Sequence, residues 1–414
     1  MKTALTERFL RYVAIPSQSN PAVSEVPSSP GQWDMVRLLE SELTALGFVD
    51  LHISEHACLT GKLPATPDVS PNTPAVGFCA HVDTVDVNLS PEIHPQIVRN
   101  YDGGVITLNR EQGIYLDPAE HPELNAYVGD DIICTDGTSV LGADDKAAVT
   151  SIMTAMQHIV EQKISHGDIY VAFVPDEEIG LRGAKKLELE RFPVAYAYTL
   201  DCCGIGEVVY ETFNAGSGFV RIRGISAHPM SAKGVLLNPI LVATDLIQLF
   251  NRLETPENTD GTDGYIWIHG IQGNQSDAVV ELNIRDHNKE RYEARKAYIR
   301  QAVALIQEKY PRAQIELELE DVYANIKDAL RDDNREAIDH IYEAMKRLDI
   351  TPITLSMRGG TDGSYLSSQG LLTPNFFTGA HNFHSNCEFL PLNSFEKSCQ
   401  MVLTLIELIR EKAQ

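Results

Sequence analysis

The sequence predicts an α/β protein with a mixed, largely parallel sheet flanked by helices and a smaller α+β domain inserted into it. Before about residue 211, short continuous apolar runs, typical of strands buried on both faces, alternate with amphipathic helical stretches. Between residues 211 and 325 the expected order becomes strand, helix, strand, strand, helix, strand, which is typical of a ferredoxin-like domain. Helix and strand then alternate again. We therefore expect one domain from residues 1–210 and 326–414, and an inserted domain from residues 211–325.

In the first segment, apolar residues recur at helical spacing from Trp33 to Leu46 and predict a helix there. The elements expected next are a buried strand over 75–80, a helix over 145–161, a strand over 169–174, a short helix over 183–189 and a strand over 194–200. Each strand is short and uninterrupted by charge, as expected when both faces of a sheet are covered.

In the inserted segment the pattern of the expected elements changes. The expected elements are a strand over 219–224, a helix over 239–253, strands over 265–271 and 278–285, a helix over 291–310 and a strand over 314–319. In the last strand, apolar residues alternate with glutamates, so one face is expected to be buried. After about residue 326, the expected alternation of helix and strand ends in an amphipathic helix over 395–409.

Composition restricts the classes of partner. The 414 residues include 34 basic and 58 acidic side chains, a formal net charge of −24, which disfavours nucleic acid and anionic membrane surfaces as partners. No apolar run approaches the ~18 residues of a membrane span, and the first residues lack the apolar stretch of a secretion signal. The seven cysteines show no framework spacing, so we expect free thiols and a cytoplasmic protein.

Acidic and imidazole side chains cluster where expected strands end, which is where open α/β sheets bind their ligands. Taken singly, each has an ordinary alternative: a solvated strand end for His81 and Asp83, a helix cap for Asp144, and a solvated loop for Asp176-Glu177-Glu178. Taken together they indicate a site. The candidates are His81, Asp144, Glu178, Asp201 and one of His381 and His384, between which spacing does not choose.

Two imidazoles and three carboxylates form a ligand set that suits zinc. One carboxylate bridging two ions about 3.5–4 Å apart would leave each ion one histidine and one further carboxylate, and a water shared by the ions would have a pKa near ~7. Glu177, next to a candidate ligand, would take a proton from that water and pass it to a leaving amine. Asp83 is placed to hold the tautomer of His81.

At this point the chain resembles a known family, the M20 co-catalytic metallopeptidases. The resemblance spans essentially the whole chain. It rests chiefly on His81-Val82-Asp83-Thr84, Gly142-Ala143-Asp144-Asp145-Lys146-Ala147, Pro175-Asp176-Glu177-Glu178-Ile179-Gly180 and Met357-Arg358-Gly359-Gly360-Thr361-Asp362-Gly363.

The resemblance implies two zinc ions per subunit and a role for each candidate. The implied ligands are His81 and Asp201 for one ion, Glu178 and His384 for the other, and Asp144 bridging both. Glu177 is implied as the catalytic base and Asp83 as the residue that orients His81.

The inserted domain is implied to act as a lid that contacts substrate. His228, in Ile225-Ser226-Ala227-His228-Pro229, resembles the family's histidine that steadies the oxyanion, while Asn283, Arg285 and Arg358 resemble positions that contact the substrate's carboxylate end. The ordinary alternatives are a turn residue before proline for His228 and a surface ion pair with Asp286 or Glu290 for Arg285.

Within the family, the lid and the segment 357–363 resemble enzymes that release the N-terminal residue from tripeptides, so the implied partner is a small peptide. The alternatives are another amide hydrolase of the family, such as a dipeptidase or an acylamino-acid deacylase, and a non-catalytic peptide- or metal-binding protein. The sequence leaves open whether the protein is a monomer or a homodimer.

The chain departs from the family pattern at a few positions near the expected site. Cys202 and Cys203 replace small residues after Asp201, His381 stands where the pattern has tyrosine, and Cys387 stands where it has a second histidine. None removes an implied ligand, but thiols near the site would add oxidation sensitivity or affinity for soft metals.

Overall fold

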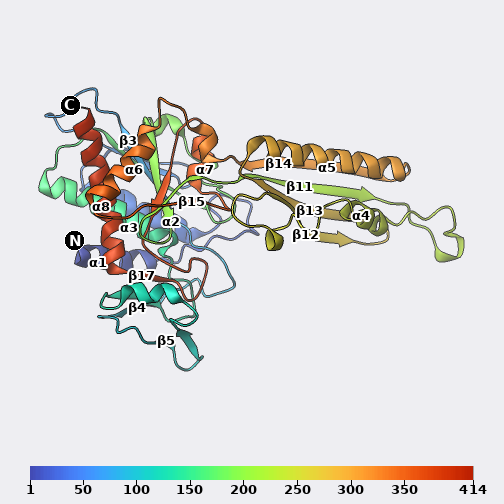
Figure 1. Cartoon of the computed structure of the whole chain (residues 1–414), viewed down its shortest axis with the longest axis horizontal. Helices are drawn as coiled ribbons and strands as arrows, with labels where there is room; N and C mark the ends of the chain where they lie inside the picture. The colour runs from blue at the N-terminus through green and yellow to red at the C-terminus, as the bar shows by residue number, and fades with distance from the viewer. Residues whose placement is uncertain (414) are drawn as a thin grey trace. The chain divides into compact units, whose positions relative to one another are not determined.

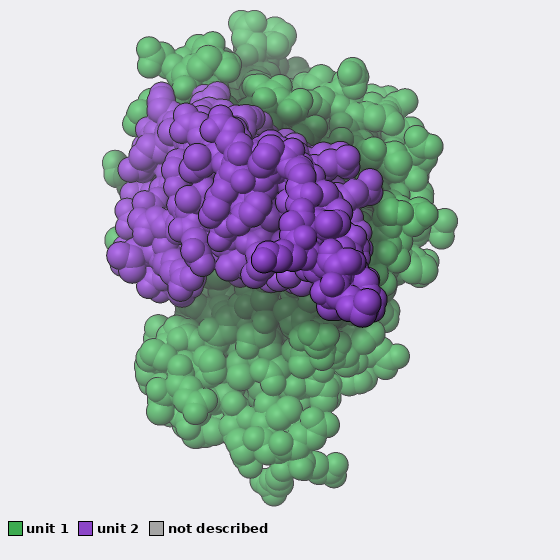
Figure 2. Space-filling view, turned by 90° about the vertical axis from the view of Figure 1, so that its right-hand side faces the viewer, with its two compact units in different colours: residues 1–210, 329–355, 361–414 green, residues 211–328, 356–360 purple. Residues whose placement is uncertain are grey.

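The computed structural model describes residues 1–413, which divide into two compact units (Figures 1 and 2). Unit 1 comprises Met1–Tyr210, Ala329–Leu355 and the segment from Thr361 to the C-terminus. Unit 2 comprises Glu211–Asp328 and the short segment Ser356–Gly360. The segment 356–360, expected with the α/β domain, thus groups with unit 2.

An eight-stranded mixed sheet forms the centre of unit 1. Its parallel middle is β8-β3-β9-β16, and antiparallel strands extend it on the β1-β2 side and at β10. In spatial order the strands are β1 (Val49–Ile53), β2 (Leu59–Leu63), β8 (Ile169–Val174), β3 (Val76–His81), β9 (Tyr196–Cys202), β16 (Asn375–Phe377), β10 (Glu207–Glu211) and β15 (Ile353–Ser356). The predicted fold class is confirmed.

Helices cover both faces of this sheet, which explains why its central strands are uninterrupted apolar runs. On one face, α3 (Ala143–Gln162) packs on β3 and β9, with α1 (Lys2–Val13), α8 (Leu392–Lys412) and α6 (Glu336–Arg347) around it. On the other, α7 (Asp362–Ser368) packs against Cys79 and Ala197 of the same strands. Helix α2 (Pro30–Ala45) packs on β1 and β2 and is joined to α1 through Glu42, which accepts hydrogen bonds from Arg8 and Tyr12.

Two small sheets in unit 1 have no counterpart in the sequence prediction. One has the order β17-β7-β4 (Phe389–Pro391, Ile132–Thr135, Pro95–Val98), and the other is the pair β5 and β6 (Ile106–Asn109, Ile114–Leu116). They share a core of their own around Tyr101, Leu116, Ile132 and Phe389. Strands of three or four residues are too short to show a clear period in the sequence.

Unit 2 has the expected ferredoxin-like order, with a four-stranded antiparallel sheet β12-β13-β11-β14. Alternate residues of β11 and β13 pack under the two helices, and the intervening residues lie on the open face of the sheet. The elements are β11 (Asn214–Arg223), α4 (Pro239–Ile247), β12 (Tyr265–Gly273), β13 (Asp277–Asp286), α5 (Lys289–Lys309) and β14 (Gln314–Tyr323).

Two expected helices differ from the structure. Residues 183–189 form short 3-10 turns, η2 (Ala184–Lys186) and η3 (Leu189–Arg191), instead of an α-helix. Helix α4 ends at Ile247 rather than at residue 253. The amides of Leu249 and Phe250 donate to carbonyls three residues back, and the Leu253 amide donates to the side chain of Asn251 instead of a helical carbonyl.

Within residues 1–413 no helix is both long and apolar enough to cross a membrane. All seven cysteines are free thiols, as expected.

The core of unit 2 generates a first prediction. Leu282→Ala should lower the free energy of unfolding by about 2–5 kcal/mol, because Leu282 is fully buried between the sheet and its helices. The same change at Leu305, which is 54% exposed on α5, should cost less than about 0.5 kcal/mol. Denaturant unfolding of both variants checks this, and equal losses would contradict the assigned packing.

Candidate metal centre

The candidate residues of unit 1 lie on the elements that meet at the carboxyl ends of the central strands. His81 is the last residue of β3, Glu177 and Glu178 follow β8, and Asp201 lies near the end of β9. Asp144 lies at the start of α3, where the backbone of residues 144 and 145 is not yet helical, and His384 lies in the loop between β16 and β17.

Asp144 lies between the two histidines that the family resemblance favoured. Its Oδ1 is 3.0 Å from His81 Nε2, and its Oδ2 is 3.0 Å from His384 Nε2. His384 Nε2 is also 3.0 Å from Glu178 Oε2. Each oxygen of one carboxylate thus faces a different imidazole, which is the arrangement that a bridging ligand requires.

Among the residues that the structure describes, side chains able to bind a cation form three close groups. In each, the potential ligand atoms lie within 4.8 Å of one another. The groups are His81, Asp144 and Asp201; Asp144, Glu178 and His384; and His81, Glu177 and Glu178. The first two share Asp144 and divide the candidates as the resemblance implies.

Asp83 lies behind His81 and is fully buried. Its Oδ1 is 3.2 Å from His81 Nδ1, and the same carboxylate accepts hydrogen bonds from the backbone amides of Glu177 and Glu178. Glu177 directs its Oε2 toward the cluster, 4.0 Å from His81 Nε2. One aspartate therefore orients an imidazole and the turn that carries the candidate base.

The protonation equilibria reflect crowded, buried carboxylates. Burial raises the pKa of Glu177 and Asp201 well above the ordinary range, and burial together with the charge of Asp144 raises that of Glu178 to about 7. Burial also opposes the charge of Asp144, but hydrogen bonds from both histidines outweigh it and lower that pKa. The same bonds, to Asp144 and Glu178, raise the pKa of His384 to about 11.

Backbone amides around the cluster are held by buried side-chain oxygens. The amide of His81 donates to Asp145, that of Asp144 to Glu388, that of Glu178 to Asp83 and that of Asp201 to Asn375. All four acceptors are at most 1% exposed. The positions of four candidate ligands are therefore fixed through the main chain as well as through side-chain packing.

Sequence reasoning missed Asp145, Asn375 and Glu388, and also Asp362, which is buried near the cluster with a pKa raised to about 7 by burial. Asp145, Asp362 and Glu388 lie within or close to the segments that carry candidate ligands, but nothing in an acid-rich sequence distinguishes a buried carboxylate from a solvated one.

The donor set fits divalent cations. Imidazole nitrogens and carboxylate oxygens are both zinc ligands. Buried oxygens of Glu178, Asp145 and Asp362 have no hydrogen-bond partner among residues 1–413. Because several buried carboxylates without enough cations are costly, bound metal would compensate this charge.

The structure separates the two histidines that spacing could not. His381 is stacked on Phe389, and its Nε2 lies 2.6 Å from the hydroxyl of Tyr127. Burial lowers its pKa to about 4, and it belongs to none of the three groups. His381 is therefore a neutral packing residue beside the site.

Lys146 lies in the first turn of α3 and is fully buried. The ammonium group donates to the carbonyl of Ile15 at 2.7 Å, and burial lowers its pKa to about 7, opposed by the charge of Asp83. It ties α3 to the segment after α1.

The cysteines near the site are not ligands in this geometry. None of the three close groups contains a cysteine. Burial raises the pKa of the Cys203 and Cys387 thiols, so neither is favoured as a thiolate.

In unit 2, His228 is exposed and precedes the 3-10 turn η4 (Pro229–Ser231). Its Nδ1 accepts the Met230 amide at 3.2 Å, which leaves the proton of the neutral imidazole on Nε2. His228 therefore presents a hydrogen-bond donor to solvent.

The two candidate arginines of unit 2 are partly engaged. Arg285 Nη1 donates to the carbonyls of Gly216 and Ile284, and no ion pair of Arg285 is found in the part of the chain that the structure describes. Arg358 donates to Gly261, Asp263 and Thr259 and stacks on Phe213 and Tyr265.

Both arginines bond through their Nη atoms, and Nε has no hydrogen-bond partner within residues 1–413. Asn283 lies on the open face of the sheet, opposite Trp267 on β12 and Ser217 on β11.

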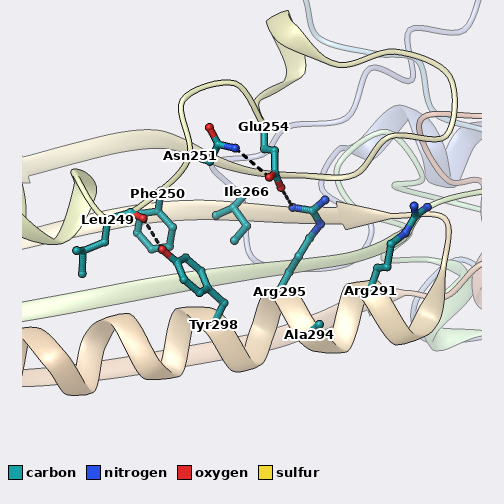
Figure 3. Close-up of a pocket in the computed structure, with 9 residues that line it drawn as sticks. All are labelled: Leu249, Phe250, Asn251, Glu254, Ile266, Arg291, Ala294, Arg295 and Tyr298. Carbon is teal, nitrogen blue, oxygen red and sulfur yellow. Dashed lines mark hydrogen bonds and ion pairs between the residues drawn. The ribbon is translucent and has the colours of Figure 1, made fainter.

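A cavity of about 510 Å³ lies elsewhere in unit 2, between α5 and the loop before β12 (Figure 3). Leu249, Phe250, Ile266 and Tyr298 form an apolar wall. Its arginines are already paired, since Arg295 contacts Glu254 and both Arg291 and Arg295 contact the buried Asp286. The charges in this cavity are balanced, and it contains none of the candidate residues.

Comparison with known proteins shows the family of the chain. The sequence profile described as peptidase family M20/M25/M40 matches residues 142–408. A peptidase T-like protein of Yersinia pestis is 54% identical over 97% of this chain and 96% of its own length. Peptidase T of Geobacillus kaustophilus is 41% identical over the full length of both chains. The chain belongs to the M20/M25/M40 peptidase family.

Solved structures show the same fold. Aminopeptidase PepT from Bacillus cereus superimposes with a TM-score of 0.75 at 23% identity, over 99% of each chain. A tripeptidase from Staphylococcus aureus superimposes with a TM-score of 0.76 at 22% identity, also over 99% of each chain. A dinuclear metal-binding M20 peptidase from Bacillus subtilis superimposes with a TM-score of 0.65 at 14% identity, over 99% of each chain.

The geometry predicts different outcomes for the two neighbouring histidines. His384→Gln should lower the metal content of the dialysed protein, because His384 contacts both Asp144 and Glu178. His381→Gln, the matched control, should retain the wild-type content, because His381 bonds to Tyr127. Elemental analysis after dialysis measures both, and loss of metal only in His381→Gln would show that the ligand is assigned wrongly.

Proposed function

We propose that this protein is a metallo-aminopeptidase that releases the N-terminal residue from tripeptides. Full-length relatives named peptidase T support the substrate class. The observation that carries the chemistry is the bridging geometry of Asp144, with one oxygen facing each histidine of two ligand groups.

The proposed metal is zinc, two ions per subunit. His81 and Asp201 would hold one, Glu178 and His384 the other, and Asp144 both. When bound, such ions lower the pKa of a water that they share and polarise the peptide carbonyl.

Glu177 is proposed as the general base. Its carboxylate takes a proton as the water oxygen bonds to the carbonyl carbon, and returns it to the nitrogen of the departing dipeptide as the C–N bond breaks. A raised pKa, caused first by burial, suits a group that must both accept and release a proton. Asp83 supports this role by accepting the Glu177 amide.

Unit 2 is proposed to bind substrate, as a lid. His228 would donate from Nε2 to the developing oxyanion. Arg285 and Arg358, with Asn283, would contact the carboxylate end of the peptide, for which both arginines retain Nε–H donors. A cytoplasmic location is proposed as well, since all seven cysteines are free thiols.

The proposed base predicts a clear separation of activity from metal binding. Glu177→Gln should reduce kcat by about 10²–10⁴-fold, because the proton acceptor is lost, while metal content stays at the wild-type value. Asp176→Asn is the control: Asp176 is also buried, but it bonds to Ser28 and Gln32. Its kcat should stay within tenfold. An unchanged rate in Glu177→Gln would refute the role.

The proposed substrate class is tested by comparing kcat/KM for Ala-Ala-Ala, Ala-Ala and N-acetyl-alanine. The tripeptide should be cleaved fastest, with release of the N-terminal alanine. Faster turnover of Ala-Ala would favour a dipeptidase, and faster turnover of N-acetyl-alanine a deacylase. Either result would overturn the tripeptidase assignment and keep the metallohydrolase.

A further inference from the structure

Glu388 is a buried carboxylate that binds the loop carrying Asp144. It is 1% exposed. Its Oε2 accepts the amides of Leu141 at 2.7 Å and Gly142 at 2.9 Å, and its Oε1 accepts the amide of Asp144 at 3.1 Å. Three amide donors in four consecutive residues converge on one side chain.

These amides have no place in the regular helical bonding of α3. The backbone at Asp144 and Asp145 is not helical, and the first regular amide is that of Lys146, which donates to the carbonyl of Gly142. Gly142 has φ +72°, in the left-handed region, so a glycine suits the turn. Without Glu388 the three buried amides would lose their acceptor.

Glu388 belongs to the same closed loop as His384. Residues 381 and 389 pair through two backbone hydrogen bonds of 2.9 and 3.1 Å, which bring the ends of the segment together. Within it, His384 Nε2 contacts Asp144 Oδ2, and Glu388, four residues later, accepts the Asp144 amide. The loop therefore holds both the side chain and the main chain of Asp144.

We infer that Glu388 is a positioning residue that sets the bridging carboxylate of Asp144 between the two metal ions. The inference rests on the metal centre of the proposed function and extends it beyond the ligands. Glu388 is not itself a ligand in this geometry, because both of its oxygens accept amides and it belongs to none of the three close groups.

The role requires a carboxylate of this length. Both oxygens of a carboxylate accept hydrogen bonds, and bonds to a charged acceptor are stronger than neutral ones. A glutamine has one acceptor and one donor, so at one of the two ends an NH₂ group would face a backbone N–H. An aspartate is shorter by one methylene and reaches fewer of the amides.

The test measures zinc affinity by competition with a chromophoric chelator. We expect Glu388→Gln and Glu388→Asp to bind zinc about 10–100-fold more weakly than wild type, as is usual when partners of metal ligands are changed. The Co²⁺-substituted variants should show shifted visible absorption bands. With saturating metal, kcat should fall and KM should stay within twofold.

The matched control is Asp130→Asn. Asp130 is also a buried carboxylate of unit 1, and it accepts the amides of Asp131 and Asn393 at 2.8 and 2.9 Å without contacting a proposed ligand. Its zinc affinity should stay within twofold of wild type. Thermal unfolding of the metal-free proteins should show that each variant folds.

The inference would be overturned, and the metal centre kept, by the following result: both Glu388 variants retain the wild-type zinc affinity and Co²⁺ spectrum, while Asp144→Asn loses zinc. Equal losses in Asp130→Asn, or Glu388 variants that fail to fold without metal, would also overturn it by showing a general structural role. Wild-type protein that binds no zinc would overturn the proposed function as well.

Discussion

The carboxylate of Asp144 is the constraint on which the rest of the metal centre depends. Each of its oxygens faces a different imidazole, and further carboxylates lie around this buried side chain. Like charges at such a density repel one another, and burial strengthens the repulsion. The histidines compensate part of it, which is why the pKa of His384 is raised while that of Asp144 is lowered.

The fold makes this arrangement possible by placing functional groups at strand ends and fixing their backbones. Parallel neighbours β8, β3 and β9 end at one edge, so residues distant in the sequence meet there. Regular secondary structure stops at the same edge, and main-chain amides there need other acceptors. Buried side chains supply them: Asp83, Asp145, Asn375 and Glu388. The main chain at four candidate ligands is therefore held by hydrogen bonds that need no cation.

Much of the fold was predictable, because in long segments the spacing of apolar residues distinguishes a helix from a strand. The strand over 169–174 and the order of elements in unit 2 followed from apolar patterning alone. The short strands around β7 were not predictable, since three or four residues hold too little pattern. Helix α4 ends at Ile247, and beyond it the amides bond to carbonyls three residues back and to the Asn251 side chain, which apolar spacing does not reveal.

By itself the sequence determined which residue types follow which strands, and this was enough to identify the family and to name a set of candidate ligands. Residue spacing did not choose between His381 and His384, a choice that only the family resemblance implied, and it did not reveal Glu388, since both questions depend on side-chain direction and burial. Tertiary structure decided them: it directs His381 to Tyr127 and His384 to Asp144. The physical reason is that spacing along a loop does not fix its path, whereas pairing of residues 381 and 389 does.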